Sequence, residues 1–147
     1  MARRNGWGDM NEYTLADLSE GLAHSFTALV TEQMVDGFAR LSGDVNPLHT
    51  DDAFAQALGH PGRVAHGLLV AGFFSTLVGL HLPGKHALLH GVDAQFHRPV
   101  YPGDTLTVSG EVSHVSAAAR QVEIKAKITN QRGETVCKAT LKVGLNA

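Results

Sequence analysis

The chain has 147 residues, of which 44% are apolar, and its 12 basic and 14 acidic side chains leave a net charge of −2. This length and composition predict one packed domain rather than two. Charged residues make up only 18% of the chain, which argues against a chain that is disordered throughout, and their balance argues against a protein that coats nucleic acid.

Cysteine usage indicates the compartment. Cys137 is the only cysteine in the sequence, so an internal disulfide or a cysteine-based zinc site cannot form, and a reducing, cytoplasmic compartment is expected. The first fourteen residues include Asp9 and Glu12 and no apolar run, unlike a secretory signal. We therefore predict a mobile tail over residues 1–14 and one domain over residues 15–147.

A short strand and a helix are expected first in the domain. Residues 25–30 are predicted to form the strand, and the Thr31 hydroxyl can cap the helix that follows. Apolar side chains then recur at a spacing that places one stripe along this helix, and Gly43 is expected to end it. The stripe consists of Met34, Val35, Phe38 and Leu41.

A proline interrupts the helical pattern after this point. Asn46 precedes Pro47 and should be extended, and residues 51–58 are predicted to form a short helix that ends at Gly59. Residues 67–80 are apolar on nearly every side, which predicts a helix buried on nearly every side. The mostly apolar part of it spans about 13 residues, whereas a membrane span needs about 20, so a core helix is the better interpretation.

The remainder of the chain alternates between apolar and polar residues. The segments 88–97, 105–113, 121–128 and 137–143 each have the period of a half-buried strand. In the first of these segments Leu88, Val92 and Phe96 stand at alternate positions and are predicted to share the inward face. Short turns join the later segments and make neighbouring strands antiparallel. A sheet with one apolar face, curled around a helix that is apolar all round, is a hotdog arrangement, so we predict a single α+β domain of that kind.

One stretch of the sequence has a pattern that is typical of a catalytic motif. Residues 38–49 read Phe-Ala-Arg-Leu-Ser-Gly-Asp-Val-Asn-Pro-Leu-His, and Ala55 stands six places later. This stretch resembles the signature of MaoC-like, (R)-specific enoyl-CoA hydratases at each of its fixed positions. The segments Gly-Arg-Val-Ala-His-Gly-Leu-Leu at 62–69 and Pro-Val-Tyr-Pro-Gly-Asp at 99–104 resemble the family's entry into its central helix and one of its turns. The resemblance runs from about residue 31 to the end.

The spacing of Asp44 and His49 suits this chemistry on physical grounds. Five residues apart, the two side chains would not stack on one face of a continuous helix. An extended Asn46 and a proline turn can fold His49 back toward Asp44, and the pair can then share one water. Hydration of a 2-enoyl thioester needs a base for the water that attacks C3 and an acid that delivers a proton to C2.

The resemblance implies a role for each residue. Asp44 and His49 form the catalytic dyad, with Asp44 favoured as base and His49 as acid, although the sequence leaves the two roles interchangeable. Gly67 donates its backbone N–H to the thioester oxygen at the start of the buried helix. Asn46 braces the loop and Ser75 lies near the dyad. The product is an (R)-3-hydroxyacyl thioester, and the reaction is reversible.

The same resemblance sets the expected partners. The substrate is an acyl-CoA or acyl carrier protein thioester, and no cofactor, membrane or nucleic acid is expected. A homodimer joined by sheet edges is expected because unpaired edges seek partners. The histidines between residues 60 and 97 have no compact ligand spacing, so no metal site is predicted.

Other interpretations stay open at this point. Asp44 could be an ordinary turn residue, His49 structural, Gly67 a tight helix entry and Ser75 a donor to a helix carbonyl. A hotdog acyl-CoA thioesterase usually places an acidic residue on or beside the central helix, and residues 64–84 contain none. A non-catalytic acyl-binding subunit would be expected to lose Asp44 or His49.

Overall fold

A five-stranded antiparallel sheet is the frame of the domain. The computed structural model describes residues 8–146. The strands stand in the order β1-β3-β4-β5-β2, and every neighbouring pair is antiparallel. They are β1 (Ala23–Leu29), β2 (Ala87–Phe96), β3 (Thr105–Ser116), β4 (Gln121–Thr129) and β5 (Thr135–Leu145). The predicted α+β hotdog fold and each predicted strand are confirmed, with ends that differ by a few residues.

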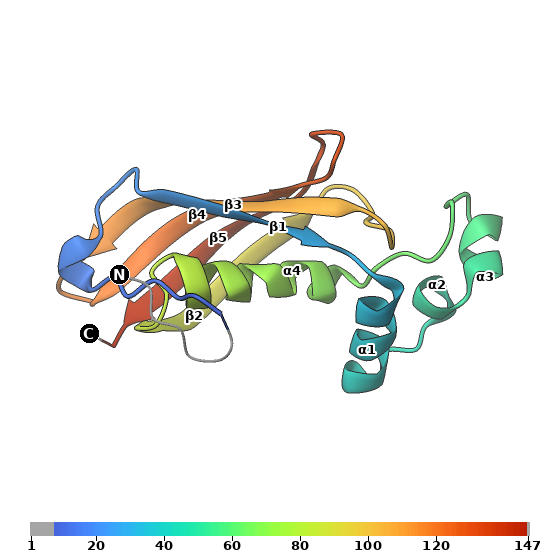
Figure 1. The fold of residues 1–147 in the computed structure, drawn as a ribbon, viewed down its shortest axis with the longest axis horizontal. Coiled ribbons are helices and arrows are strands. Elements are labelled where there is room, and N and C mark those ends of the chain that lie inside the picture. Colours follow the sequence, from blue (N-terminus) through green and yellow to red (C-terminus); the bar gives the residue numbers. More distant parts are fainter. Residues whose placement is uncertain (1–7, 147) are drawn as a thin grey trace.

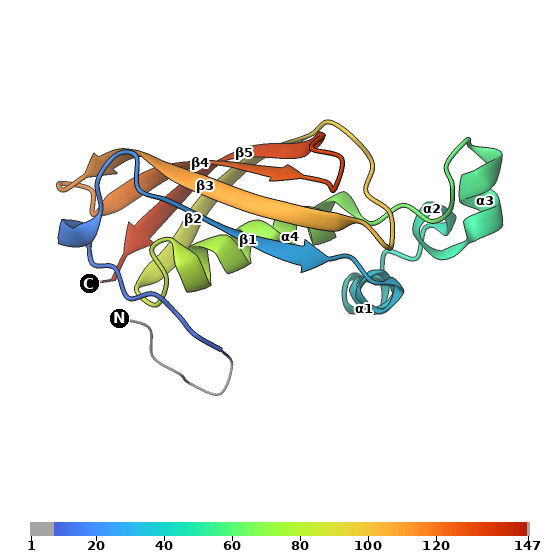
Figure 2. The same cartoon turned by 45° about the horizontal axis from the view of Figure 1, so that its top comes forward.

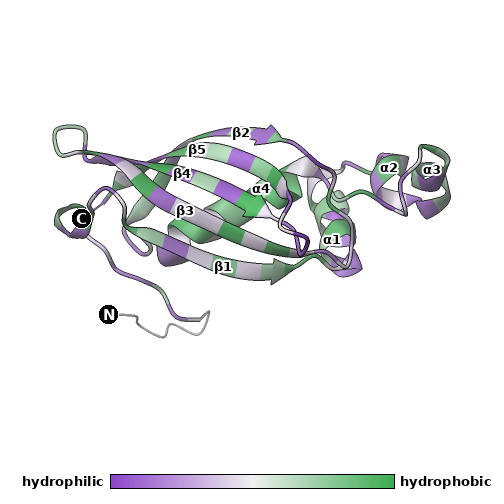
Figure 3. Cartoon of the chain, turned by 90° about the horizontal axis from the view of Figure 1, so that it is seen from above, coloured by the Kyte–Doolittle hydropathy of each residue, from purple (hydrophilic) through white to green (hydrophobic). Residues whose placement is uncertain are grey.

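The helices fall into two groups (Figure 1). The helix α4 (Gly67–Thr76) continues as a π-helix, η2 (Leu77–His81), along one face of the sheet. The helices α1 (Glu32–Ser42), α2 (Pro47–Thr50) and α3 (Asp52–Ala57) lie at one end, and α2 and α3 project past the strands (Figure 3). A 3-10 turn, η1 (Leu15–Asp17), precedes β1. Over residues 8–146, no helix is long and apolar enough to cross a membrane.

The hydrophobic core lies between α4 and the sheet, which curves over the helix (Figure 2). Phe74 of α4 and Leu77 of η2 are fully buried. Alternate residues of β3, β4 and β5 face them, because successive side chains of a strand point to opposite faces. The largest fully buried side chains from these strands are Leu106, Val108, Val112, Val122, Ile124, Ile128 and Leu141.

Gly110 in β3 lets the helix approach the sheet closely. A Cβ atom placed on Gly110 would lie 2.7 Å from Cδ2 of Leu77 and 2.9 Å from Cγ2 of Ile124. Both distances are well inside van der Waals contact. The missing side chain therefore sets how near the C-terminal part of the helix comes to the strands.

One face of α4 is uncovered, so the prediction that this helix is buried on nearly every side is wrong. Leu68 is 72% exposed, and Gly72 and Ser75 are exposed as well. These positions are four and three residues apart, which places them on one stripe of the helix. Val70 and Phe74 are the buried residues of α4. The sheet covers one side of the helix only, although the sequence is apolar on both.

The alternation predicted for β2 is broken by a bulge. The pairing of β2 with β5 shifts between Leu89 and Gly91, so His90 is an extra residue in the ladder. Val92 pairs with the buried Leu141 and faces the α4 side. Leu88, before the bulge, is therefore on the opposite face from Val92. The prediction that both share one face is wrong because a bulge reverses the parity of a strand.

The predicted ends of α1 are confirmed, but its buried face is narrower than expected. The Thr31 hydroxyl accepts a hydrogen bond from the Met34 N–H at 3.1 Å. Only Val35 and Ala39 are buried in this helix, whereas Met34 and Leu41 are exposed. Since α1 lies at the end of the sheet, little of the sheet is available to cover its stripe.

Part of the predicted tail is bonded to the domain. The Asn11 N–H donates to the Leu80 carbonyl at 2.8 Å, and the Lys85 N–H donates back to the Asn11 carbonyl at 2.8 Å. The Tyr13 N–H donates to the Pro83 carbonyl at 3.2 Å. Residues 11–13 are thus attached to the end of η2, which the sequence does not reveal. Residues 1–7 of the predicted tail lie outside the described part of the chain.

The close approach at Gly110 generates a stability prediction. We expect Gly110→Ala to lower the free energy of unfolding by about 1–3 kcal/mol, because overpacking forces Leu77 and Ile124 to move. Gly37→Ala is the matched control. Outside the adjacent residues and backbone of α1, no atom of residues 8–146 lies within 4 Å of a Cβ added at Gly37, and alanine there should raise stability by about 0.5–1 kcal/mol. Urea unfolding of both variants measures the difference. Equal effects would contradict the packing argument.

Candidate active site

The candidate site is built on residues 30–62, the arm that leads from β1 through α1, α2 and α3 toward α4. Gly43 ends α1 with a φ of 80°, a conformation that glycine adopts readily. Asn46 is extended, with φ −50° and ψ 134°, and its side chain accepts a hydrogen bond from the Leu48 N–H at 2.9 Å. Pro47 begins α2, where a missing N–H has no cost. This single turn of helix, which the sequence analysis did not predict, brings His49 back toward the end of α1.

Asp44 and His49 face each other across this turn. Oδ2 of Asp44 lies 3.8 Å from Nε2 of His49. The Nδ1–H of His49 donates to the Val64 carbonyl at 2.7 Å, and since a carbonyl only accepts, Nδ1 carries the hydrogen. Nε2 is then the ring nitrogen that faces the carboxylate. A separation of 3.8 Å is too long for a direct hydrogen bond but allows one water to contact both atoms.

A second histidine, His66, completes the group. Its side chain is buried, and its Nε2–H donates to the main-chain carbonyl of Asp44 at 2.9 Å. Its ring stacks on His49, with centroids 3.8 Å apart and planes at 25°. No sequence pattern predicts a role for His66. The only sequence signal for a role of His66 is its place directly before Gly67. The hydrogen bond to Asp44 joins residues 22 positions apart, which no local pattern predicts.

These three residues are also of types that bind divalent metal ions, and each offers a ligand atom within 4.8 Å of the others. Two of the four ring nitrogens, however, already donate to carbonyls. Stacked rings also direct their in-plane lone pairs side by side, whereas a tetrahedral site needs ligands that converge. The arrangement suits the binding and activation of a water better than chelation.

The sequence over residues 16–134 matches the model of a family described as MaoC like domain. The chain belongs to the MaoC-like family. The match spans the arm, the central helix and most of the sheet. The resemblance stated from the signature residues is therefore confirmed at the level of the family.

Relatives of this MaoC-like chain are similar over most of their length. It is 33% identical to an (R)-specific enoyl-CoA hydratase of Rhodospirillum rubrum, over 82% of this chain and 84% of that protein. It is 34% identical to a 3-hydroxybutyryl-CoA dehydratase of Methylorubrum extorquens, over 74% of this chain and 69% of that protein. The solved structure of an R-hydratase from Pseudomonas aeruginosa matches with a TM-score of 0.87 at 30% identity, covering 92% of this chain and 87% of that one.

Gly67 occupies the first position of α4, next to His66. The first N–H groups of a helix have no acceptor within it, and they carry the positive end of the helix dipole. A Cβ atom on Gly67 would lie 3.3 Å from the ring of Phe96, so the aromatic ring of the β2 end lies against this position. The site therefore has a candidate donor for a negatively charged oxygen close to the Asp44–His49 pair.

Ser75 is not brought to the pair in the same way. It stands eight residues beyond Gly67, which corresponds to about 12 Å along a helix, and it lies on the exposed stripe with Leu68. Ser75 lies on the face of α4 that no other element of residues 8–146 covers. Any contact it makes with a substrate must come through that surface.

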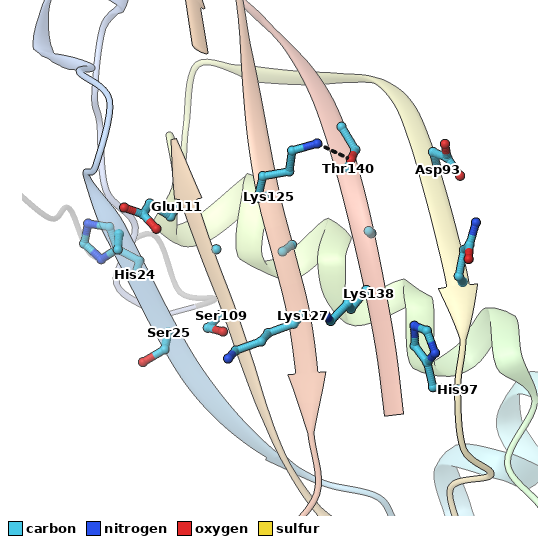
Figure 4. A pocket seen from close by; sticks show the side chains of 15 residues that line it. His24, Ser25, Asp93, His97, Ser109, Glu111, Lys125, Lys127, Lys138 and Thr140 are labelled. Atoms are coloured by element: carbon cyan, nitrogen blue, oxygen red, sulfur yellow. Dashed lines mark hydrogen bonds between the residues drawn. The ribbon is translucent and has the colours of Figure 1, made fainter. Parts of the chain in front are cut away.

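A hollow of about 1000 Å³ lies elsewhere, on the face of the sheet turned away from α4 (Figure 4). Its lining includes Lys125, Lys127 and Lys138, and the last two stand at paired positions on β4 and β5. Neither Asp44 nor His49 lines it. The sheet separates this hollow from the helix, so it is not part of the candidate site.

Arg63 ties α1 to the segment that leads into α4. Its guanidinium is largely buried and donates to Asp36 at 2.6 Å, with Glu32 at 3.9 Å. The Arg63 N–H also donates to Asp52 at the start of α3, at 2.8 Å. The hydrogen bond from Arg63 lowers the pKa of Asp36, and the same bond raises the pKa of Arg63. Through its side chain and its main-chain N–H, Arg63 thus connects α1 and α3 to the segment that leads into α4.

This ion pair generates a pH prediction. Because the folded-state pKa of Asp36 is lowered, its contribution to stability is present above the unfolded-state value of about 3.9 and is lost as the pH falls through the lower folded value. We expect the Tm of the natural chain to exceed that of Asp36→Asn at neutral pH, and the difference to shrink between pH 5 and pH 3 (about the range over which an aspartate titrates). Thermal melts across this range measure it.

The control for this prediction is the same substitution in a variant that lacks the Arg63 guanidinium. In an Arg63→Met background, Asp36→Asn should produce no comparable pH-dependent difference in Tm. A difference in Tm between the natural chain and the Asp36→Asn variant that is independent of pH would contradict the assignment.

Proposed function

We propose that the protein hydrates trans-2-enoyl-CoA to (R)-3-hydroxyacyl-CoA and catalyses the reverse dehydration. The observation that carries the proposal is the 3.8 Å approach of the Asp44 carboxylate and the free Nε2 of His49, beside the N-terminus of α4. The relatives named as an (R)-specific enoyl-CoA hydratase and a 3-hydroxybutyryl-CoA dehydratase support the same chemistry.

The reaction follows from this geometry. A water held between Asp44 and His49 gives one proton to the carboxylate while its oxygen bonds to C3 of the enoyl thioester. The electron pair of the double bond moves toward the thioester carbonyl, whose oxygen gains negative charge next to the Gly67 N–H. A proton delivered to C2 then completes the addition of H and OH. The addition of water involves no net oxidation or reduction of the substrate, so the reaction requires no redox cofactor.

The bond to Val64 bears on the division of roles within the pair. Nδ1 of His49 donates to that carbonyl, so a proton passed to C2 must leave from Nε2. We assign Asp44 as the base for the water and His49 as the acid for C2. The proton that Asp44 takes from the water passes to the bare Nε2 of His49 and from there to C2, so both groups end the cycle as they began it.

A thioesterase is the alternative within this fold. It would direct water at the thioester carbon rather than at C3. The central helix α4 and η2, residues 67–81, carry no carboxylate, and both members of the pair sit on the arm. These positions favour the hydratase, and the presence of both residues disfavours a subunit that only binds acyl chains.

We expect purified protein to remove the absorbance of the conjugated enoyl group when it is added to crotonyl-CoA or octenoyl-CoA. The product should be the (R)-3-hydroxyacyl thioester, identified by a chiral assay, with no free thiol released. Asp44→Asn and His49→Ala should each lower kcat/KM by about 10²–10⁴-fold, because each removes one proton-transfer group.

The control for this activity test is His114→Ala, an exposed histidine of β3, which should keep full activity. Near-normal turnover by both dyad variants would contradict the dyad. Thiol release without hydration would identify a thioesterase instead.

The protein is further proposed to act as a homodimer. Val92 and Phe96 lie on the α4 side of β2, a free edge of the sheet, yet they remain 45% and 50% exposed. Leu68 on the uncovered face of α4 is apolar and exposed as well. A second copy that lays its own β2 and α4 against these residues would bury both patches at once, as a two-fold interface does.

Light scattering after size exclusion tests the dimer. The natural chain should have twice the mass of one chain, and Val92→Asp should shift it toward the monomer because a charge would be buried in the interface. Leu29→Asp is the matched control, since Leu29 is exposed on the opposite edge strand, β1, and should stay dimeric. A monomeric natural chain would contradict the proposal.

The compartment and the acyl carrier complete the proposal. We propose a cytoplasmic location, since the single cysteine of the sequence, Cys137, leaves no partner for an internal disulfide. Burial of Cys137 in β5 raises the pKa of its thiol to about 11, so it is not a reactive thiolate at neutral pH. Coenzyme A is proposed as the carrier because both named relatives act on CoA thioesters by name.

A further inference from the structure

His66 is the side chain that contacts both Asp44 and His49. Its Nε2–H donates to the Asp44 carbonyl at 2.9 Å, and its ring stacks on His49 at 3.8 Å. We propose that His66 is a positioning residue for the hydration, which holds the carboxylate and the acid-base ring in their working orientation. This inference rests on the proposed function and extends it to a residue outside the dyad.

The exposure of His66 argues that it acts through its neighbours and does not touch the substrate. The residue is only 2% exposed, and its Nδ1 is enclosed by protein and has no hydrogen-bond partner among residues 8–146. Its other nitrogen, Nε2, is occupied by the Asp44 carbonyl. Neither nitrogen is free to reach a thioester. Its ring also contacts Phe38 of α1, with centroids 4.8 Å apart, which fixes its plane from the other side.

The two stacked rings are held in opposite tautomers. His49 carries its hydrogen on Nδ1, bonded to the Val64 carbonyl, and His66 carries its hydrogen on Nε2, bonded to the Asp44 carbonyl. Each ring is therefore fixed by one backbone acceptor and by the face of the other ring. The result is that Nε2 of His49 stays directed at the carboxylate.

Asp44 needs such a support because it sits in a loop. Residues 43–46 lie between α1 and α2, and the side chain of Asp44 is half exposed. Its Oδ1 accepts from the Asn46 N–H at 3.3 Å, a bond within the loop that does not attach the loop to anything else. His66 directly precedes α4, so its bond to Asp44 connects the loop to the helix that also begins with Gly67. This bond thereby fixes the acid-base pair relative to the Gly67 N–H, which is the proposed donor to the thioester oxygen.

Three substitutions separate the two contacts of His66. His66→Gln keeps a donor at the place of Nε2 but loses the ring, His66→Phe keeps an aromatic ring but loses the donor, and His66→Leu loses both. We expect kcat to fall about 100-fold in the Leu variant and about 10-fold in the other two, since a displacement of about 1 Å in a catalytic group can cost 10²-fold. KM should stay within about twofold, because His66 does not touch the substrate.

The control is His97→Leu, an exposed histidine, which should leave kcat unchanged. Thermal melts must show that each variant is folded at the assay temperature. If the Leu variant does not fold, the Gln and Phe variants carry the test. Unchanged kcat in the folded Leu variant, or in both the Gln and Phe variants, would overturn the proposal.

A second readout keeps this test separate from the proposed function. The ¹⁵N NMR signals of the imidazoles should show His49 with its hydrogen on Nδ1 and His66 with its hydrogen on Nε2. In His66→Leu, the His49 signals should broaden, because the ring loses the stacking contact that fixes its plane, although the Val64 carbonyl still holds the hydrogen on Nδ1. If the natural chain hydrates no enoyl thioester, the proposed function fails, while the His49 signals still decide the role of His66. Unchanged His49 signals in the Leu variant would count against it.

Discussion

The close packing of the central helix against the sheet is the constraint on which the rest of the structure depends. Phe74 and Leu77 are fully buried under the strands, and burial of each such side chain contributes about 1.5–3 kcal/mol. Gly110 allows the approach, since any side chain there would meet Leu77. With the helix held at this depth, its first residue, Gly67, comes to rest at the end of the sheet where the arm begins.

The candidate site is a junction between two segments that are distant in sequence. The arm contributes Asp44 and His49, and the entrance of α4 contributes residues 63–66. Each segment donates a hydrogen bond to a main-chain carbonyl of the other: His49 donates to the Val64 carbonyl, and His66 donates to the Asp44 carbonyl. Arg63 adds an ion pair with α1. Because each contact uses a different pair of groups, the dyad is fixed from several directions, as proton transfer at a defined atom requires.

The uncovered face of α4 and the free edge of β2 lie beside the candidate site. Leu68 on this face of α4, and Val92 and Phe96 on the α4 side of β2, leave apolar surface exposed. Phe96 also lies against Gly67, so this surface adjoins the place proposed for the thioester oxygen. Apolar walls beside a polar acid-base pair suit a substrate with a reactive thioester and a hydrocarbon chain.

The sequence by itself determined the elements whose signals are local. The period of two predicted the strands, and Thr31 and Gly43 predicted the ends of α1. The proline turn between Asp44 and His49 predicted that the two side chains approach each other, because the five-residue spacing is local. Only the tertiary structure decided the place of His66, the bulge at residue 90 and the exposure of one face of α4. These features depend on contacts between residues far apart in the chain, and a pattern of apolar residues does not specify which neighbour, or which second copy, covers them.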